Sequence, residues 1–182
     1  TRKNVQIPAK NSIAQAAVAL IQPGNIVLMD GGTTTGALVE QLPHDLPFTL
    51  ITHSPGLAVS MVDHPLAEVI LIGGQLYKHS LVTVGAAMIE SIQRIHADLF
   101  FMGVTGIHHT AGFTTANYEE SCVKRALSER AAETVVMASP EKLNSASAFA
   151  IGGLEIASTL IVEESLDDEM SQLLARLQIT VI

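Results

Sequence analysis

The sequence predicts an α/β domain built on a mostly parallel sheet that is flanked by helices. Short apolar runs recur along the chain, each run is continuously apolar rather than alternating, and helix-like stretches separate the runs. Continuous apolar character is typical of strands buried on both faces, and the strand-helix alternation is that of a parallel sheet. With 182 residues, 48% hydrophobic and 15% charged, the chain is long and apolar enough for one domain with a sizeable core.

The elements follow from this pattern in order. The first predicted helix ends at Pro23-Gly24, a pair that does not readily continue a helix. The segments 73–84 and 103–116 break the alternation, and because each follows a strand, they are the first places to look for a ligand site. The predicted strands are 26–29, 48–51, 69–72, 99–102, 135–137, 159–162 and 179–182, and the predicted helices are 12–22, 34–42, 56–62, 86–95, 119–132 and 168–177.

Charge and composition exclude several classes of protein. Ten Lys and Arg against 18 Asp and Glu give a net charge of −8. This charge argues against non-specific binding of nucleic acid, because such binding relies on clustered cations. The single cysteine, Cys122, cannot form an internal disulfide, and no signal-peptide pattern opens the chain, so we expect a cytoplasmic setting. No apolar run approaches the length of a membrane helix. Residues 1–11 are polar and resemble the end of a linker from an upstream domain, which leaves 12–182 as the folded domain.

The loop 30–35 (Asp30-Gly31-Gly32-Thr33-Thr34-Thr35), between a strand and a helix, is the most informative segment. Glycines let backbone N–H groups approach an anion, threonine hydroxyls add donors, and a helix N-terminus favours negative charge. The loop therefore predicts a phosphate site, although a tight turn with a threonine cap is the simpler alternative. It is not a nucleotide-hydrolysing P-loop, because Ala37 and Leu38 stand where Lys and Ser or Thr are needed.

Other candidate residues are locally ambiguous. The segment 52–55 (Thr-His-Ser-Pro) offers hydroxyl and imidazole contacts or a serine helix cap, and Gly73-Gly74 suits either a ligand lying on the backbone or a tight turn. Glu119 and Lys124 look like ordinary helix-surface residues, and Lys142 is either a second phosphate partner or a solvated lysine.

The pair His108-His109 is the one hint of a metal, but we expect adjacent side chains to point apart, and no other ligand stands at metal-binding spacing. We therefore predict no metal site and no cofactor.

Taken together, these segments resemble the C-terminal effector domain of the DeoR family of bacterial transcription regulators. They occur in family order across residues 10 to about 165. The points of similarity are 26–34 (IVLMDGGTT), 52–54 (THS), 72–74 (IGG), 84–85 (VG), 97–103 (ADLFFMG), 106–107 (GI), 112–114 (GFT) and 123–125 (VKR).

The resemblance implies a fold similar to ribose-5-phosphate isomerase and the CoA-transferases, used as a sensor. A phosphorylated sugar or related metabolite would bind here and change the affinity of a separate N-terminal helix-turn-helix, absent from this chain, for operator DNA. It would make the protein a regulator, with repression the expected mode, of carbohydrate metabolism.

Site residues carried over from the resemblance fall into two groups. Two positions depart from the family: His53 replaces a common Asn, and Ser139 replaces the Asp of a common Asp-Ser-Ser-Lys run. The phosphate contacts would be Asp30, Gly31, Gly32, Thr33, Thr34, Thr35 and Lys142, and the sugar contacts Thr52, His53, Ser54, Gly73, Gly74, Lys78, Gly103, Glu119 and Lys124.

Two other functions compete with a sensor. A sugar-phosphate isomerase would need a positioned carboxylate base, for which Asp98 and Glu119 are the only fair candidates, and the Gly-rich segment that leads into the isomerases' catalytic glutamate has no match. A nucleotide-binding or purely oligomeric role is the third possibility. We expect a non-enzymatic sensor that forms homodimers or homotetramers, since operators with repeated half-sites call for a symmetric assembly.

Overall fold

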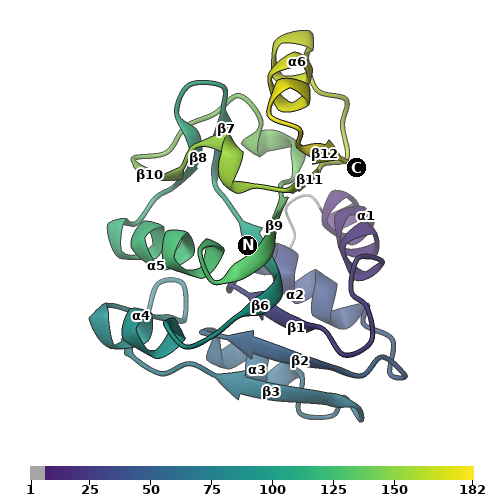
Figure 1. Cartoon of the computed structure of the whole chain (residues 1–182), viewed down its shortest axis with the longest axis vertical. Coiled ribbons are helices and arrows are strands. Elements are labelled where there is room, and N and C mark those ends of the chain that lie inside the picture. The colour runs from purple at the N-terminus through teal and green to yellow at the C-terminus, as the bar shows by residue number, and fades with distance from the viewer. Residues whose placement is uncertain (1–6) are drawn as a thin grey trace.

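A computed structural model of the chain describes residues 7–182, which form a parallel sheet of seven strands with helices on both faces (Figure 1). The strand order is β12-β11-β9-β6-β1-β2-β3, and every neighbouring pair runs parallel. β3 and β12 are therefore the two edges. The strands are β1 (Ile26–Met29), β2 (Phe48–Thr52), β3 (Ala67–Leu71), β6 (Ala97–Gly103), β9 (Ala131–Met137), β11 (Thr159–Ile161) and β12 (Thr180–Val181).

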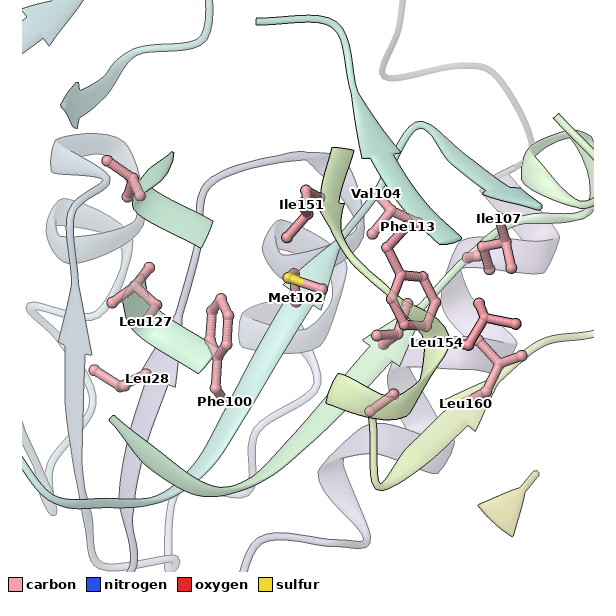
Figure 2. Close-up of a cluster of buried hydrophobic side chains, with 14 of the residues drawn as sticks. Leu28, Phe100, Met102, Val104, Ile107, Phe113, Leu127, Ile151, Leu154 and Leu160 are labelled. Atoms are coloured by element: carbon pink, nitrogen blue, oxygen red, sulfur yellow. The ribbon is translucent and has the colours of Figure 1, made fainter. Parts of the chain in front are cut away.

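Helices cover the two faces in two groups of three. α1 (Ile7–Val18), α2 (Thr33–Glu40) and α3 (Pro55–Ser60) pack on one face, and α4 (Ala86–Ile92), α5 (Tyr118–Ser128) and α6 (Asp168–Arg176) pack on the other. Side chains along a strand point alternately to the two faces, so neighbouring residues enter different cores. In β6, Phe101 joins the α1–α3 core, whereas Phe100 joins the α4–α6 core, where Figure 2 shows it near Leu28 and Leu127.

The predicted fold class is confirmed, and all seven predicted strands are present, each with bounds within a few residues of those expected. The first helix begins at Ile7 rather than at residue 12, so residues 7–11, which we assigned to a linker, are helical; residues 1–6 of that linker lie outside the described part of the chain. The helix predicted to run to residue 132 ends at Ser128, because β9 begins at Ala131.

The two segments that break the alternation are not simple loops. The first contains the antiparallel hairpin of β4 (Gln75–Tyr77) and β5 (Val82–Val84). The second contains β7 (Gly106–His108) and β8 (Gly112–Thr115), and β8 also pairs with β10 (Phe149–Gly152). Strands of three or four residues are too short to display a hydrophobic period, which is why the sequence pattern did not predict them.

Two single turns of 3-10 helix, η2 (Pro140–Lys142) and η3 (Leu154–Ile156), complete the described elements. Within residues 7–182, no helix combines the length and the apolar character that crossing a membrane requires.

Candidate functional site

The candidate site lies where β1 and β6 end side by side, and its centre is a buried ion pair. Asp30 directly follows β1, and Lys124 reaches it from α5, with 2.5 Å between Nζ and Oδ2. Gly103, the last residue of β6, donates its N–H to Asp30 Oδ2 at 3.0 Å and accepts a hydrogen bond from Lys124 Nζ at 2.9 Å. Three segments far apart in sequence are thus joined at one point.

Both members of this ion pair are buried, and burial affects the pKa of Asp30. The side chains of Lys124 and Asp30 are 8% and 1% exposed. Burial raises the pKa of Asp30 above its ordinary value, and Lys124 and the N–H of Gly103 oppose that rise by stabilising the carboxylate. Because Asp30 is occupied by these partners and would repel an anion, we assign it to the frame of the site rather than to phosphate contact.

The predicted phosphate loop leads into the N-terminus of α2. Gly32 is the N-cap, with a φ of 139° that favours glycine, and no side chain among the described residues caps this end of the helix. Thr35 is buried, and its hydroxyl donates to the carbonyl of Gly32 at 3.1 Å. Within residues 7–182, the first-turn N–H groups of α2 therefore have no side-chain acceptor and can serve an anion.

Lys10 supplies a cation to this loop. Its ammonium donates to Thr33 Oγ1 at 2.6 Å, and the residue is only 9% exposed. Sequence reasoning missed Lys10 because it assigned residues 1–11 to a linker. Helical spacing would have been the signal, because residues 10, 13, 14 and 17 share one face of α1 and the last three are core residues.

The segment after β9 contributes a second group of polar residues. Ser139 is buried, and its hydroxyl donates to Glu141 Oε1 at 2.6 Å. Partial burial raises the pKa of Glu141, but the hydrogen bond from Ser139 and the positive charges of Lys142 and Lys10 together bring that pKa below its ordinary value. The predicted phosphate partner Lys142 is the last residue of η2 and is half-buried.

His53, at the end of β2, is held in one orientation and one protonation state. It is 2% exposed, and its Nδ1 lies 2.7 Å from the carbonyl oxygen of Thr83 on β5. Because a carbonyl only accepts, Nδ1 carries the proton, and burial lowers the pKa of the ring from 6.5 to about 4. His53 is therefore neutral near pH 7, and its Nε2 presents a lone pair.

That lone pair has no partner within the described residues, where only His53 Nε2 and Arg130 Nε are buried side-chain nitrogens or oxygens without a hydrogen bond. Since buried polar atoms are nearly always satisfied, such an orphan acceptor is a candidate contact for a donor group. Sequence reasoning selected His53 but not its partner Thr83, which lies in the unpredicted hairpin.

The other residues of the segment 52–55 act mainly as local structure. Thr52 donates its hydroxyl to the carbonyl of Met29 at 2.8 Å, which ties the end of β2 to β1. Ser54 is the N-cap of α3 and accepts from the N–H of Leu57 at 3.2 Å, so the simpler interpretation of this serine agrees with the structure.

The β4–β5 hairpin packs against the loop 30–35. A Cβ added at Gly31 would lie only 2.5 Å from Val82 Cγ1, so glycine is needed for this approach. Gly73, Gly74 and Lys78 are exposed, and Gly74 has a φ of 151°, which explains a glycine at the start of the hairpin.

The acidic residue nearest the centre is Glu120 rather than Glu119. Glu120 raises the pKa of Asp30 through its charge and accepts a hydrogen bond from Ser80 of the hairpin at 3.2 Å. Glu119 is exposed on α5. The sequence alone could not choose between two adjacent glutamates, because their orientation depends on how α5 is rotated over the sheet.

No three His, Cys, Asp or Glu residues gather as a metal would require anywhere in the described chain. The expectation that the side chains of His108 and His109 point apart is wrong, because their rings stack with centroids 4.2 Å apart. His109 instead lies 3.7 Å from Glu169, on the exposed surface of α6.

Comparison with known proteins places the chain in a family. Residues 5–164 match the family described as the DeoR C terminal sensor domain. The chain is 31% identical over its full length to the HTH-type transcriptional regulator GlpR of Haloferax volcanii, of which it covers 71%. It is 32% identical over 92% of its length to the HTH-type transcriptional repressor GlcR of Bacillus subtilis, of which it covers 64%, so it spans about two thirds of these relatives.

Solved structures support the predicted fold. Ribose 5-phosphate isomerase A of Neisseria gonorrhoeae has a TM-score of 0.55 at 12% identity, with 79% of this chain and 54% of that chain covered. The corresponding isomerase of Methanocaldococcus jannaschii has a TM-score of 0.52 at 16% identity, with 74% and 53% covered. At such identities the likeness concerns the fold alone, whereas the relatives matched by sequence are transcription regulators and not enzymes. The chain belongs to the DeoR family of transcription regulators, as a C-terminal sensor domain.

Proposed function

We propose that this chain senses a phosphorylated sugar or a related phosphorylated metabolite and thereby controls a repressor of carbohydrate metabolism. The observation that carries the proposal is the pairing of an uncapped helix N-terminus with a cation: α2 begins without a side-chain cap, and the ammonium of Lys10 lies at Thr33 in its first turn. Backbone N–H groups, threonine hydroxyls and a lysine together match the donors that bind a phosphate.

The remainder of the effector would lie toward His53. A neutral imidazole whose Nδ1 already donates to Thr83 can only accept at Nε2, so it suits a hydroxyl group and disfavours a second phosphate or a carboxylate. A molecule with a phosphate at one end and hydroxyl groups at the other would match the donors at the loop and the acceptor at His53. Sugar phosphates have this chemistry.

The effector would act on DNA only indirectly. Two relatives are named HTH-type regulators, and with a net charge of −8 this domain is a poor DNA-binding surface, so we propose that a helix-turn-helix outside this chain contacts the operator in the cytoplasm. For regulation, the effector must bind one arrangement of the assembled protein better than another. A coupling of about 1 to 3 kcal/mol would change DNA affinity about 5- to 150-fold.

A thermal-shift screen tests the proposal. The chain is heated with phosphorylated sugars, with the same sugars lacking phosphate, and with inorganic phosphate. A compound present at about 100 times its dissociation constant should stabilise the fold by about 2.7 kcal/mol. We expect selective stabilisation by one phosphorylated sugar, and no conversion of that sugar to an isomer.

Three variants locate the binding. Thr33→Ala and Lys10→Met each remove a donor at the loop and should abolish the shift. Arg94→Met removes an exposed cation just beyond α4 and should leave the shift unchanged. If no phosphorylated compound stabilises the wild-type chain, or if Thr33→Ala responds as the wild type does, the phosphate assignment is wrong.

A further inference from the structure

The two edges of the sheet are built very differently. β12 has only two residues, and short edge strands are one way in which proteins avoid unwanted pairing. β3 pairs with β2 through all five of its residues without a bulge, and no strand of the described chain lies on its other side. Its sequence, Ala-Glu-Val-Ile-Leu, contains no lysine or proline, the residues that commonly block pairing at an edge. β3 is therefore an unprotected edge, at the bottom of Figure 1.

The backbone direction of β3 shows which groups are available. The N–H of Ile72 donates to Thr52 O on β2. Because successive residues alternate, residues 68 and 70 also direct their backbone groups toward β2, whereas residues 67, 69 and 71 direct theirs outward. The outward N–H of Ala67 is taken by His64 Nδ1 at 3.1 Å. This leaves the N–H and C=O of Val69, the N–H and C=O of Leu71, and the C=O of Ala67 facing away from the sheet.

Apolar side chains surround this edge. A shallow groove of about 410 Å³ between α3 and β3 is lined by Ala58, Val59, Met61, Val62, Ala67 and Val69. Val59 and Val62 on the helix side are 70% and 74% exposed, and Leu66, Ile70 and Leu71 are about half exposed. Large apolar side chains thus gather around a row of free hydrogen-bonding groups.

We propose that β3 is the contact between two copies of this chain, which pair antiparallel about a twofold axis at Val69 and extend the sheet across the dimer. The two Val69 residues would exchange both of their backbone hydrogen bonds, and the N–H of each Leu71 would donate to the C=O of Ala67 in the other copy. In this register the C=O of each Leu71 also faces the N–H of Ala67 in the other copy, so it would replace His64 Nδ1 as the acceptor of that N–H. The register also places Glu68 opposite Ile70 of the second copy, so the two Glu68 carboxylates do not face each other.

Self-pairing fits this edge because one patch supplies both sides of a twofold interface. The five exposed apolar residues around β3 present about 200 to 350 Å² per copy, if a fully exposed aliphatic side chain is worth 1.5 to 3 kcal/mol at about 25 cal/mol per Å². Two copies would bury about 400 to 700 Å². The upper end of this range approaches the apolar part of a small specific interface, whose total buried area is about 1,200 Å². The contact deepens the proposed function by giving the symmetric regulator its surface, but it rests on β3 itself and not on any ligand.

Val69→Pro is the sharpest test. Proline removes the outward N–H of residue 69 and, because that group does not bond to β2, leaves the internal ladder intact. Val181→Pro is the matched control, since Ile182 and Thr180 donate to β11 and the N–H of Val181 likewise points outward at the opposite edge. Analytical ultracentrifugation at tens of micromolar should give the wild type and Val181→Pro at least twice the 19.3 kDa of one chain, and Val69→Pro half the wild-type mass.

A second variant keeps the test decisive if Val69→Pro does not fold. In a Cys122→Ser background, Val69→Cys should form a disulfide between copies under mild oxidation, because the two residues would face each other across the axis, whereas Val181→Cys should not. A wild type that sediments as a monomer, or a folded Val69→Pro that keeps the wild-type mass, overturns the proposal. The thermal shift by a phosphorylated sugar is measured on the same variants, so failure of the ligand site and failure of the interface are read separately.

Discussion

Asp30 and Lys124 illustrate how one buried residue pair can join three segments of a candidate site. The pair joins the end of β1 to α5, and Gly103 adds the end of β6 through both of its backbone groups. A buried charge without a partner is costly, so each member requires the other. The pair therefore serves mainly to position the loop 30–35 relative to α5.

Lys124→Met should lower the free energy of unfolding by about 3 to 5 kcal/mol, because it leaves the buried carboxylate of Asp30 without its cation. Urea unfolding followed by circular dichroism at fixed protein concentration measures this loss. Lys78→Met, which removes an exposed lysine, should change stability by no more than about 0.5 kcal/mol. The double variant Asp30→Asn with Lys124→Met should recover part of the loss of stability. An equal loss in Lys124→Met, Lys78→Met and the double variant would contradict this account.

Among the elements, the β4–β5 hairpin connects the two halves of the candidate site. Its Val82 side chain fills the space beside Gly31, Thr83 holds His53, and Ser80 donates to Glu120 on α5. If the loop 30–35 moved on binding phosphate, it would therefore displace the hairpin, and the hairpin would in turn displace α5. Close packing of this kind transmits small shifts because it tolerates few intermediate positions.

Gly31→Ala should destabilise the fold by about 1 to 3 kcal/mol, because the new methyl group would overlap Val82 and force β5 or the loop to shift. Gly36→Ala is the matched control: it lies within α2, nothing stands within 4 Å of its added Cβ, and alanine favours a helix by about 0.5 to 1 kcal/mol. The melting temperature should therefore fall in Gly31→Ala and rise in Gly36→Ala. A neutral Gly31→Ala would mean that the hairpin does not hold this close contact in solution.

At the scale of the whole molecule, the proposed effector site and the proposed dimer contact lie in different parts of the sheet. The candidate site lies at the carboxyl ends of the central strands β1 and β6, whereas β3 forms the sheet edge two strands away from β1. β2 links the two regions, since it pairs with β3 along its length and is followed directly by His53. An effector that shifts the end of β2 could therefore bias an arrangement of two copies across β3.

Acid should weaken the whole fold through His53. Its pKa is lowered to about 4 in the folded chain and is 6.5 when unfolded, so the unfolded state binds more protons below pH 6.5. The stability contributed by the neutral ring is complete above pH 6.5 and is lost as the pH falls toward 4. Between pH 7 and pH 5 the loss should be about 2 kcal/mol.

Comparing the wild type with His53→Asn across this range isolates the effect, because asparagine does not titrate. The raised pKa of Asp30 acts in the opposite direction, since the folded state then takes up its proton more readily, but both proteins share it and it cancels from the difference. A difference in unfolding free energy that stays constant from pH 7 to pH 5 would show that His53 is not buried and neutral.

The sequence by itself determined the fold class, the seven strands of the sheet, the loop 30–35 and the family. These features depend on local patterns, since continuous apolar runs indicate buried parallel strands and a glycine-threonine turn before a helix indicates an anion site. Only the tertiary structure showed that Lys124 is buried against Asp30, that Lys10 rather than a linker lies at Thr33, and that Glu120 rather than Glu119 lies nearest the ion pair.

Each of these contacts joins residues from elements that are distant along the chain, so it depends on how helices are rotated and where strands end in space. The exposed edge at β3 also depends on the tertiary structure, because the sequence of a strand does not show whether the strand lies at the centre or at the edge of the sheet. Local propensity acts over a few residues, whereas burial and partner choice arise only when the chain has packed, and for that reason the sequence predicted the elements and the packing decided the site.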